Sequence, residues 1–272
     1  MAKQTSEERG QLIGLGRTAE IYAWGDDRAL KLYHAGWPAA TAEHEAEINR
    51  VVAALGVPAP AVDGVLALDG RAGVLFERLV GPSLLHQVAA RPWMLVHAVH
   101  IFTDLHLAMH APEVASRDLP SQRELLARRI RDASPVPDRV RETALRRLEQ
   151  LPEGHALCHG DYHPDNVLVT PRGPIIVDWV SASRGHPLAD VAQTELLLRI
   201  GEPPASIVPR RLLAAARGYV RRSYIRRYLR RRPARAEELA AWRLPIAVAR
   251  LAEEIPEERS PLLWLIERIE AA

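Results

Sequence analysis

The sequence predicts an α+β protein with two lobes, residues 1–79 and residues 80–272. Three observations support this class: short β-branched runs separated by glycine turns near the N-terminus, one amphipathic stretch after them, and a single compact hairpin at residues 167–177 within an otherwise helical second half. The smaller lobe should be an antiparallel sheet with one helix, and the larger lobe should be mainly helical. With 272 residues and 47% hydrophobic composition, the chain can bury a substantial core.

The first elements are expected to be three strands. Residues 12–24 predict a strand, a glycine turn and a second strand, and residues 29–33 predict a third. The first turn contains Gly14, Gly16, Arg17 and Thr18. Glycines allow close backbone approach, and exposed N–H groups can cradle phosphates. A plain hairpin turn explains the two glycines equally well.

The third strand contains Lys31, one of only two lysines among 36 Lys plus Arg. A compact ammonium kept at this position indicates a site that a broad guanidinium would not suit. Residues 42–55 then predict a helix that ends at a glycine and a proline-rich break. Its acidic residues are candidates to pair with Lys31, and Glu45 is favoured over Glu43 and Glu47. The alternative is a solvated acidic helix start.

The hairpin predicts a cation site. Its strands, 167–169 and 175–177, flank a turn at 171–174, so Asn166 and Asp178 should meet at its open end. Hard oxygen ligands of this kind suit magnesium. Asp161 lies five positions before Asn166, in an H-x-D-x-x-x-x-N arrangement typical of γ-phosphoryl transfer. The alternative is a polar loop in which Asp and Asn only favour the turn.

Together these segments resemble the aminoglycoside phosphotransferase and choline kinase-like family of small-molecule kinases. The resemblance covers about Leu12 to Ala192 and is carried by the segments H-G-D-Y-H-P-D-N-V-L, I-V-D-W and G-H-P-L-A-D-V-A. It implies a bilobal, protein-kinase-like fold, ATP as donor with GTP as an alternative, Mg²⁺, and a small-molecule hydroxyl as acceptor.

The resemblance also implies residue roles. Asp161 would be the catalytic base, Asn166 and Asp178 would bind magnesium, and Asp190 would hold the catalytic loop from behind. The nucleotide would contact the glycine segment, the Lys31 pair and a hinge that offers backbone groups of residues 77 and 79, a set comprising Gly14, Gly16, Arg17, Thr18, Lys31, Glu45, Phe76, Glu77 and Leu79. Two departures are Ala19, where the family has a glycine, and Asp165, where glycine is common.

The acceptor is not determined by these motifs. A polycationic aminoglycoside, the leading interpretation, would need carboxylates such as those of Glu253, Glu254, Glu257, Glu258, Glu267 and Glu270. The arginine-rich segment 210–235 favours a neutral or anionic acceptor instead, so a choline-like amino alcohol, a sugar and a nucleoside stay alternatives. A protein kinase is disfavoured because no A-P-E motif follows residue 178. A non-catalytic nucleotide- or RNA-binding module is the remaining alternative.

Composition sets further bounds. The net charge of +2 is too small to predict nucleic-acid binding by itself, and the arginine-rich segment is interpreted first as a solvated helix face with Tyr224 and Tyr228 on one side. Cys158 is the only cysteine, so a reducing cytoplasm is expected. No apolar run is long enough for a membrane span. The histidines on the helix predicted at 93–111 are not interpreted as a metal site, and Trp179 is a candidate substrate contact.

Overall fold

The computed structural model describes residues 9–115, 118–201 and 210–271. Its contacts divide the chain into two compact units, one containing Met1–Gln87 with Asp165–Val180 and the other Val88–Pro164 with Ser181–Ala272. The hairpin that follows the H-G-D segment therefore packs with the N-terminal sheet, although it lies far along the chain. The functional boundary after residue 79 stays a prediction.

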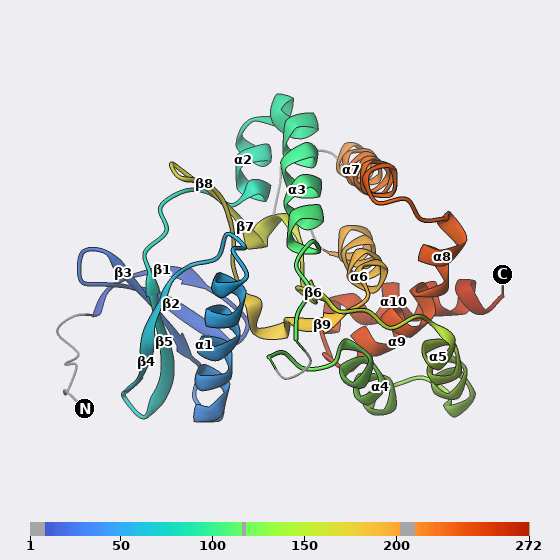
Figure 1. Ribbon diagram of the computed structural model, residues 1–272, viewed down its shortest axis with the longest axis horizontal. Coiled ribbons are helices and arrows are strands. Elements are labelled where there is room, and N and C mark those ends of the chain that lie inside the picture. The colour runs from blue at the N-terminus through green and yellow to red at the C-terminus, as the bar shows by residue number, and fades with distance from the viewer. Residues whose placement is uncertain (1–8, 116–117, 202–209, 272) are drawn as a thin grey trace. The chain divides into compact units, whose positions relative to one another are not determined.

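The first unit is built on a five-stranded antiparallel sheet (Figure 1). The strand order is β1-β2-β3-β5-β4. The β1–β2 and β2–β3 connections are the two glycine-containing turns expected from the sequence. The bounds are β1 Arg9–Leu15, β2 Ala19–Trp24, β3 Arg28–Tyr33, β4 Val62–Leu68 and β5 Arg71–Glu77.

Both faces of this sheet bury apolar side chains. Helix α1, Ala39–Ala54, covers one face, where its buried alanines join Ala19, Tyr33 and Val74. The other face carries Trp24, Leu30, Leu32, Leu68 and Leu75. Successive residues of a strand point to opposite faces, so Lys31 shares the helix side with Tyr33. Burying each leucine of this core contributes roughly 1.5–3 kcal/mol.

The hairpin consists of β7, Val167–Thr170, and β8, Gly173–Ile176. Its turn contains only Pro171 and Arg172, and is shorter than the predicted 171–174 because the second strand begins at Gly173. Gly173 has a φ of 109°, a conformation that favours glycine. The hydroxyl of Thr170 donates to the Gly173 carbonyl at 2.8 Å and accepts from the Arg172 N–H at 3.2 Å, which closes the turn.

The second unit is mainly helical and is organised around α6, Pro187–Ile200. Every residue of α6 is buried except Leu198 and Arg199, so this helix is surrounded by other elements. It packs against α7, α8 and α9 and against the short strand β6. Strand β6, Ala156–Cys158, pairs with β9, Ser183–Gly185. Cys158 is fully buried, which agrees with a packing role.

The remaining helices cover the core of this unit. The predicted helix 93–111 is present as a 3₁₀ turn, η2 Pro92–Met94, followed by α3, Leu95–Met109. The arginine-rich segment forms α7, which packs on α3 (Figure 1). The bounds are α2 Leu84–Ala90, α4 Gln122–Asp132, α5 Asp138–Gln150, α7 Arg210–Arg231, α8 Ala236–Ala241, α9 Arg243–Leu251 and α10 Pro256–Glu270, with 3₁₀ turns η3 Pro164–Asn166 and η4 Trp179–Ser181.

The α+β class predicted from the sequence is confirmed. The small antiparallel sheet with its single long helix and the mainly helical second unit are the predicted parts. No helix among the described residues is long and apolar enough to cross a membrane.

Candidate active site

Lys31 is held between two carboxylates in the first unit. Its Nζ donates to Glu45 Oε1 at 2.6 Å and to Asp178 Oδ1 at 2.8 Å. The other oxygen of Glu45 accepts a hydrogen bond from the hydroxyl of Tyr33. Glu45 is only 1% exposed and Lys31 is 12% exposed. The structure thus pairs Lys31 with the glutamate favoured from the sequence.

The ammonium of Lys31 is charged at neutral pH. Burial opposes the charged ammonium, but the carboxylates of Glu45 and Asp178 outweigh it and raise the pKa of Lys31 above its ordinary value. Burial and the adjacent Glu45 raise the pKa of Tyr33, so its hydroxyl stays a neutral donor. A buried charge is tolerated only when it is paired and hydrogen-bonded. Lys31 and Tyr33 meet that requirement for Glu45.

Asp178 is held in a strained backbone conformation. Its φ is 64°, the left-handed region that a non-glycine residue rarely adopts. Such residues persist where the surrounding structure holds them, and they cluster at functional sites. Here the residues on either side are fixed, because the Val177 N–H donates to the Asn166 carbonyl at 3.0 Å and Trp179 is fully buried. Burial of Trp179 also removes it as a substrate contact.

Asn166 and Asp178 flank the open end of the hairpin, as the spacing predicted. Asn166 directly precedes β7, and Asp178 follows β8 after one intervening residue. Asn166 is 8% exposed, whereas the Asp178 side chain is 42% exposed. One amide oxygen and one carboxylate are hard donors, which suit a magnesium ion that keeps several waters and adds phosphate oxygens. This donor set fits magnesium.

Asp165, one of the two departures from the family pattern, interacts with nearby side chains of the first unit. Its carboxylate accepts a hydrogen bond from the Ser83 hydroxyl and lies 3.3 Å from Nδ1 of His86. The same hydroxyl contacts His86 Nδ1 at 2.8 Å. The Asp165 carboxylate therefore has hydrogen-bonding partners of its own in the first unit.

The glycine segment forms a tight turn. The Gly16 N–H donates to the Ala19 carbonyl at 2.9 Å, and a Cβ on Gly16 would lie 3.3 Å from the same oxygen. Thr18 accepts from the His34 N–H at 2.9 Å. Ala19 is 2% exposed and belongs to the core under α1, so its methyl group packs inward. Gly14 lies within β1, and Arg17 lies in the bend after it.

The predicted hinge follows the last strand of the sheet. Phe76 and Glu77 end β5. The Glu77 N–H donates to the Ala61 carbonyl at 2.9 Å, so this N–H is not available to a base, and its side chain pairs with Arg172 at 2.7 Å. No hydrogen bond joins Leu79 to another described residue through its backbone.

Asp161 lies in the second unit beside a buried arginine. Its carboxylate is 3.3 Å from Nη1 of Arg250 and 3.6 Å from Nε2 of His163. Arg250 is only 4% exposed and also binds Glu258 at 2.7 and 2.9 Å and Glu253 at 2.8 Å. Burial opposes ionisation of Asp161, but His163 and Arg250 lower its pKa well below the usual range. Asp161 is therefore an ionised acceptor at neutral pH.

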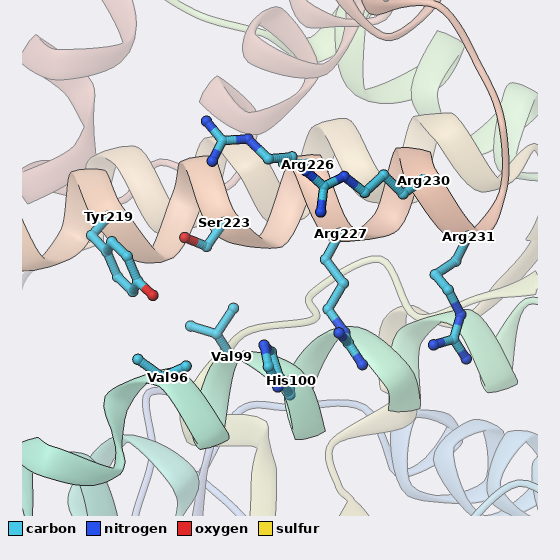
Figure 2. Close-up of a pocket in the computed structure, with 9 residues that line it drawn as sticks. All are labelled: Val96, Val99, His100, Tyr219, Ser223, Arg226, Arg227, Arg230 and Arg231. Carbon is cyan, nitrogen blue, oxygen red and sulfur yellow. The ribbon is translucent and has the colours of Figure 1, made fainter.

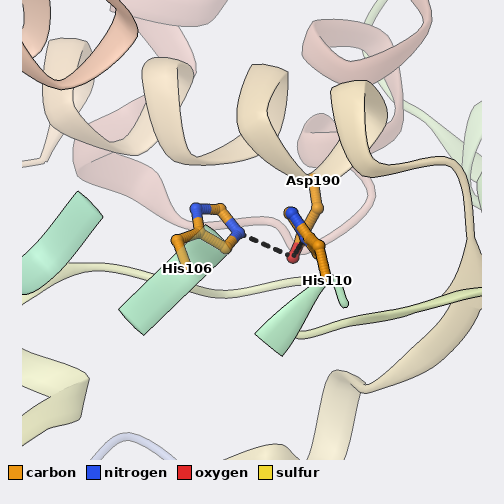
Figure 3. Close-up of side chains that lie close together, drawn as sticks. All are labelled: His106, His110 and Asp190. Atoms are coloured by element: carbon orange, nitrogen blue, oxygen red, sulfur yellow. Dashed lines mark hydrogen bonds and ion pairs between the residues drawn. The ribbon is translucent and has the colours of Figure 1, made fainter. Parts of the chain in front are cut away.

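Asp190 holds the backbone of the H-G-D segment and is itself bound by His106 and His110, whose side chains Figure 3 shows beside it. Its two oxygens accept from the N–H groups of His159 and Gly160, each at 2.8 Å. One oxygen also accepts from Nε2 of His106 at 3.1 Å and of His110 at 3.2 Å. These hydrogen bonds support the role behind the loop that the resemblance implied for Asp190.

Two tyrosines complete this network, which the sequence analysis did not identify. The hydroxyl of Tyr224 lies 2.6 Å from His106 Nδ1, and that of Tyr228 lies 2.6 Å from His110 Nδ1. Burial lowers the pKa of His106 to about 3, so its ring is neutral and donates from one nitrogen while it accepts at the other. His106 and His110 are four residues apart, as are Tyr224 and Tyr228, and this common spacing is the only sign of the pairing in the sequence.

His106, His110 and Asp190 lie close enough together to bind a metal ion, but their nitrogen and oxygen atoms already form hydrogen bonds. The ligand atoms of His106, His110 and Asp190 lie within 4.8 Å of one another. Each of these atoms takes part in a hydrogen bond within a fully buried cluster. We therefore interpret the cluster as structural.

Gly160 is required by its conformation. Its φ is 79°, and a Cβ there would lie 2.5 Å from the Ser181 carbonyl oxygen. A side chain at this position would be strained and would also collide with backbone. The glycine of the H-G-D segment thus lets Asp190 reach two consecutive N–H groups.

The profile of the phosphotransferase enzyme family (APH) matches residues 10–225. The chain belongs to this family. It is therefore a phosphotransferase, and the matched range includes Lys31, Asp161, Asn166 and Asp178. No curated protein sequence matches the chain.

Solved structures of small-molecule kinases share the fold of this phosphotransferase. A thermostable mutant of aminoglycoside phosphotransferase APH(4)-Ia, in a ternary complex with ADP and hygromycin B, is 16% identical; the match covers 96% of this chain and 92% of that chain, with a TM-score of 0.66. Amicoumacin kinase hAmiN, in complex with AMP-PNP, Ca²⁺ and Ami, is 15% identical over 98% and 89% of the chains, with a TM-score of 0.62. Choline kinase from Cryptosporidium parvum is 12% identical over 99% and 90%, with a TM-score of 0.58. The predicted kinase-like fold and family are confirmed.

The predicted site residues thus fall into two groups. Lys31, Glu45, Asn166 and Asp178 belong to the first unit. Asp161 belongs to the second and is joined to the hairpin by the intervening residues 162–165.

Proposed function

We propose that this phosphotransferase moves the γ-phosphoryl group of ATP, with Mg²⁺, to a hydroxyl group of a small molecule. The observation that carries the proposal is the Lys31 ammonium, which is largely buried and held at 2.6 and 2.8 Å between Glu45 and Asp178. A lysine fixed in this way can bind a nucleotide phosphate, and the strained, partly exposed carboxylate of Asp178 beside it can bind the metal ion.

Each residue has a distinct part in the proposal. Asn166 and Asp178 would hold Mg²⁺, which neutralises charge on the phosphate oxygens when it is bound. Lys31 would bind the α- and β-phosphates, and Glu45 would keep its ammonium in place. The glycine segment would cover the phosphates, and the chain around Glu77 and Leu79 would contact the base.

Asp161 would orient the acceptor hydroxyl. A bond forms between the acceptor oxygen and the γ-phosphorus, the bond to the leaving ADP oxygen breaks, and the hydroxyl proton passes to the Asp161 carboxylate. The low pKa of Asp161 makes it a weak base. Positioning and charge supply most of the catalysis in phosphoryl transfer, so orientation is its main contribution.

The surroundings of Asp161 support a cationic acceptor, with an aminoglycoside as the leading candidate. Asp161, Glu253 and Glu258 gather around Arg250, and Glu253 also lies 3.6 Å from Arg129. Three carboxylates facing two arginines leave a net negative charge. An acceptor ammonium could share these carboxylates with Arg250. Choline-like amino alcohols present the same charge, and sugars and nucleosides are the neutral alternatives.

A coupled ADP-release assay tests the proposal. Wild-type protein is given Mg²⁺ with ATP or GTP and a panel of aminoglycosides, amino alcohols, sugars and nucleosides. We expect turnover with one acceptor class, and we expect Asp161→Asn to remove it while nucleotide binding persists. An Asp161→Asn variant that keeps wild-type turnover would contradict the assignment of the base. Failure to bind either nucleotide would contradict the proposal as a whole.

We also propose that the protein works in a reducing cytoplasm, because its single cysteine, Cys158, is a buried free thiol.

A further inference from the structure

Helices α3 and α7 enclose a groove of about 240 Å³ that is lined mainly by arginines (Figure 2). Arg227 and Arg231 extend from α7 toward α3, and His100 and two valines rise from α3 (Figure 2). The groove belongs entirely to the second unit. Its lining residues are Val96, Val99, His100, Tyr219, Ser223, Arg226, Arg227, Arg230 and Arg231.

The helix period of α7 produces this lining. Tyr219, Ser223, Arg227 and Arg231 recur every four residues and so form one stripe of the helix. Tyr224 and Tyr228, each one position away, are fully buried against the histidines of α3. One side of α7 therefore supports the Asp190 network, and the neighbouring side presents cations to the groove.

The groove carries more positive charge than its carboxylates can neutralise. Arg227 binds Asp104 of α3 with two hydrogen bonds, at 3.0 and 2.7 Å. Among the described residues, no carboxylate lies within ion-pair distance of Arg226, Arg230 or Arg231, although the charge of Arg231 also helps to lower the pKa of Asp104. Four guanidinium groups and one carboxylate leave a local charge of +3, which exceeds the net +2 of the entire chain.

This arrangement differs from a solvated helix face. Arg227 and Arg231 extend toward α3 and line the hollow together with two hydroxyl groups, from Tyr219 and Ser223, whereas Arg226 and Arg230 line it from the exposed side of α7 (Figure 2). Guanidinium groups match phosphate oxygens with two parallel hydrogen bonds, and they keep their charge at all relevant pH values. Like charges gathered in one hollow repel each other until an anion enters.

We propose that the α3–α7 groove binds a small, soluble anion that carries two or more phosphate groups. Its volume is below the roughly 300–1,000 Å³ of sites for drug-sized ligands, and a short phosphate chain fits that size. Single-stranded RNA is usually held by several aromatic side chains that stack on successive bases. Tyr219 is the only Phe, Tyr or Trp among the residues that line the groove, and His100 supplies the only other ring, so a small anion is favoured over RNA.

Isothermal titration with inorganic tripolyphosphate tests this site. The double variant Arg226→Gln with Arg230→Gln removes two unpaired groove cations that are exposed and support no core packing. The matched control, Arg211→Gln with Arg222→Gln, removes the same charge from exposed positions of α7 outside the groove. Neither variant changes a residue assigned to phosphotransfer.

We expect the groove variant to bind tripolyphosphate at least about tenfold more weakly, a loss of about 1.4 kcal/mol, while the control stays within about twofold of wild type. Orthophosphate should bind more weakly than tripolyphosphate. Equal affinity of the two variants would overturn the proposal, because binding would then reside elsewhere, for example at the nucleotide site. Tighter binding of a uridine oligonucleotide than of tripolyphosphate, lost in the same groove variant, would overturn the choice of a small anion.

Discussion

Replacement of Asp190 by asparagine should destabilise the protein more than any surface change. The Asp190 carboxylate is fully buried and accepts four hydrogen bonds, two from backbone N–H groups at 2.8 Å and two from histidines at 3.1 and 3.2 Å. Although burial opposes ionisation, the hydrogen bonds from His106 and His110 lower the pKa of Asp190 well below its ordinary value. In Asp190→Asn, one acceptor oxygen becomes an amide group that faces donors.

The size of the effect follows from this geometry. Hydrogen bonds to a charged group contribute roughly 1.5–3 kcal/mol each, and disruption of a buried charged network costs about 3–5 kcal/mol. At about 2.1 cal/mol/K per residue, the 272 residues correspond to an unfolding entropy of about 0.6 kcal/mol/K. The expected decrease in Tm is therefore roughly 5–9 °C.

Differential scanning calorimetry measures this decrease, and Asp104→Asn provides the matched control. Asp104 is also a paired aspartate of the second unit, but it is 44% exposed and binds Arg227 at the surface. An exposed pair contributes at most about 1 kcal/mol, so the control should lose no more than about 2 °C. A Tm of Asp190→Asn within that same margin of wild type would refute the reasoning.

Three further predictions concern residues of the sites. Lys31→Met should lower kcat/KM for ATP by about 10²–10³-fold, the effect of removing a fixed charge-stabilising group, and steady-state kinetics measures it. Because His106 has a folded-state pKa of about 3, below its ordinary 6.5, the unfolded chain binds a proton that the folded chain does not. Stability should therefore fall as pH decreases from about 6.5 toward 3, by up to about 1.4 kcal/mol per pH unit for this residue, as measured by urea unfolding. In Arg250→Met, the loss of the guanidinium 3.3 Å from Asp161 should raise the pKa of that carboxylate and move the acidic limb of the kcat/KM profile to higher pH.

An unchanged kcat/KM in Lys31→Met would remove the lysine from the phosphate site. A His106→Gln variant should have a shallower dependence of stability on pH, and an unchanged slope would assign the proton uptake to other groups. An acidic limb at the same pH in Arg250→Met would show that Arg250 does not act on Asp161.

Short-range patterns were sufficient for most of the first-unit site. Asn166 and Asp178 are placed by one hairpin, whose two strands are joined by a two-residue turn, so their proximity follows from the spacing. The pairing of Lys31 with Glu45 follows from helix geometry as well. The buried face of α1 includes Ala42, Ala46 and Asn49, and Glu45 lies on it, whereas Glu43 and Glu47 do not.

Long-range packing was not accessible in the same way. His106 and Tyr224 are separated by 118 residues, and Asp161 and Arg250 by 89, so no local pattern joins them. The hydrogen bond between Ser83 and Asp165 spans 82 residues. The sequence makes Trp179 a candidate substrate contact, but its indole N–H donates to the Ile176 carbonyl and the ring is fully buried. A single sequence does not show which partner occupies each buried polar group.

In the proposed reaction, a phosphoryl group passes from ATP to a hydroxyl, with Asp161 as the orienting base. Phosphorus-31 NMR of a reaction that contains ATP, Mg²⁺ and the active acceptor tests it most directly. We predict a new phosphomonoester resonance that grows together with ADP in the wild type and is absent with Asp161→Asn, although that variant binds ATP. Formation of ADP with inorganic phosphate alone, or a phosphomonoester produced equally by Asp161→Asn, would contradict the claim.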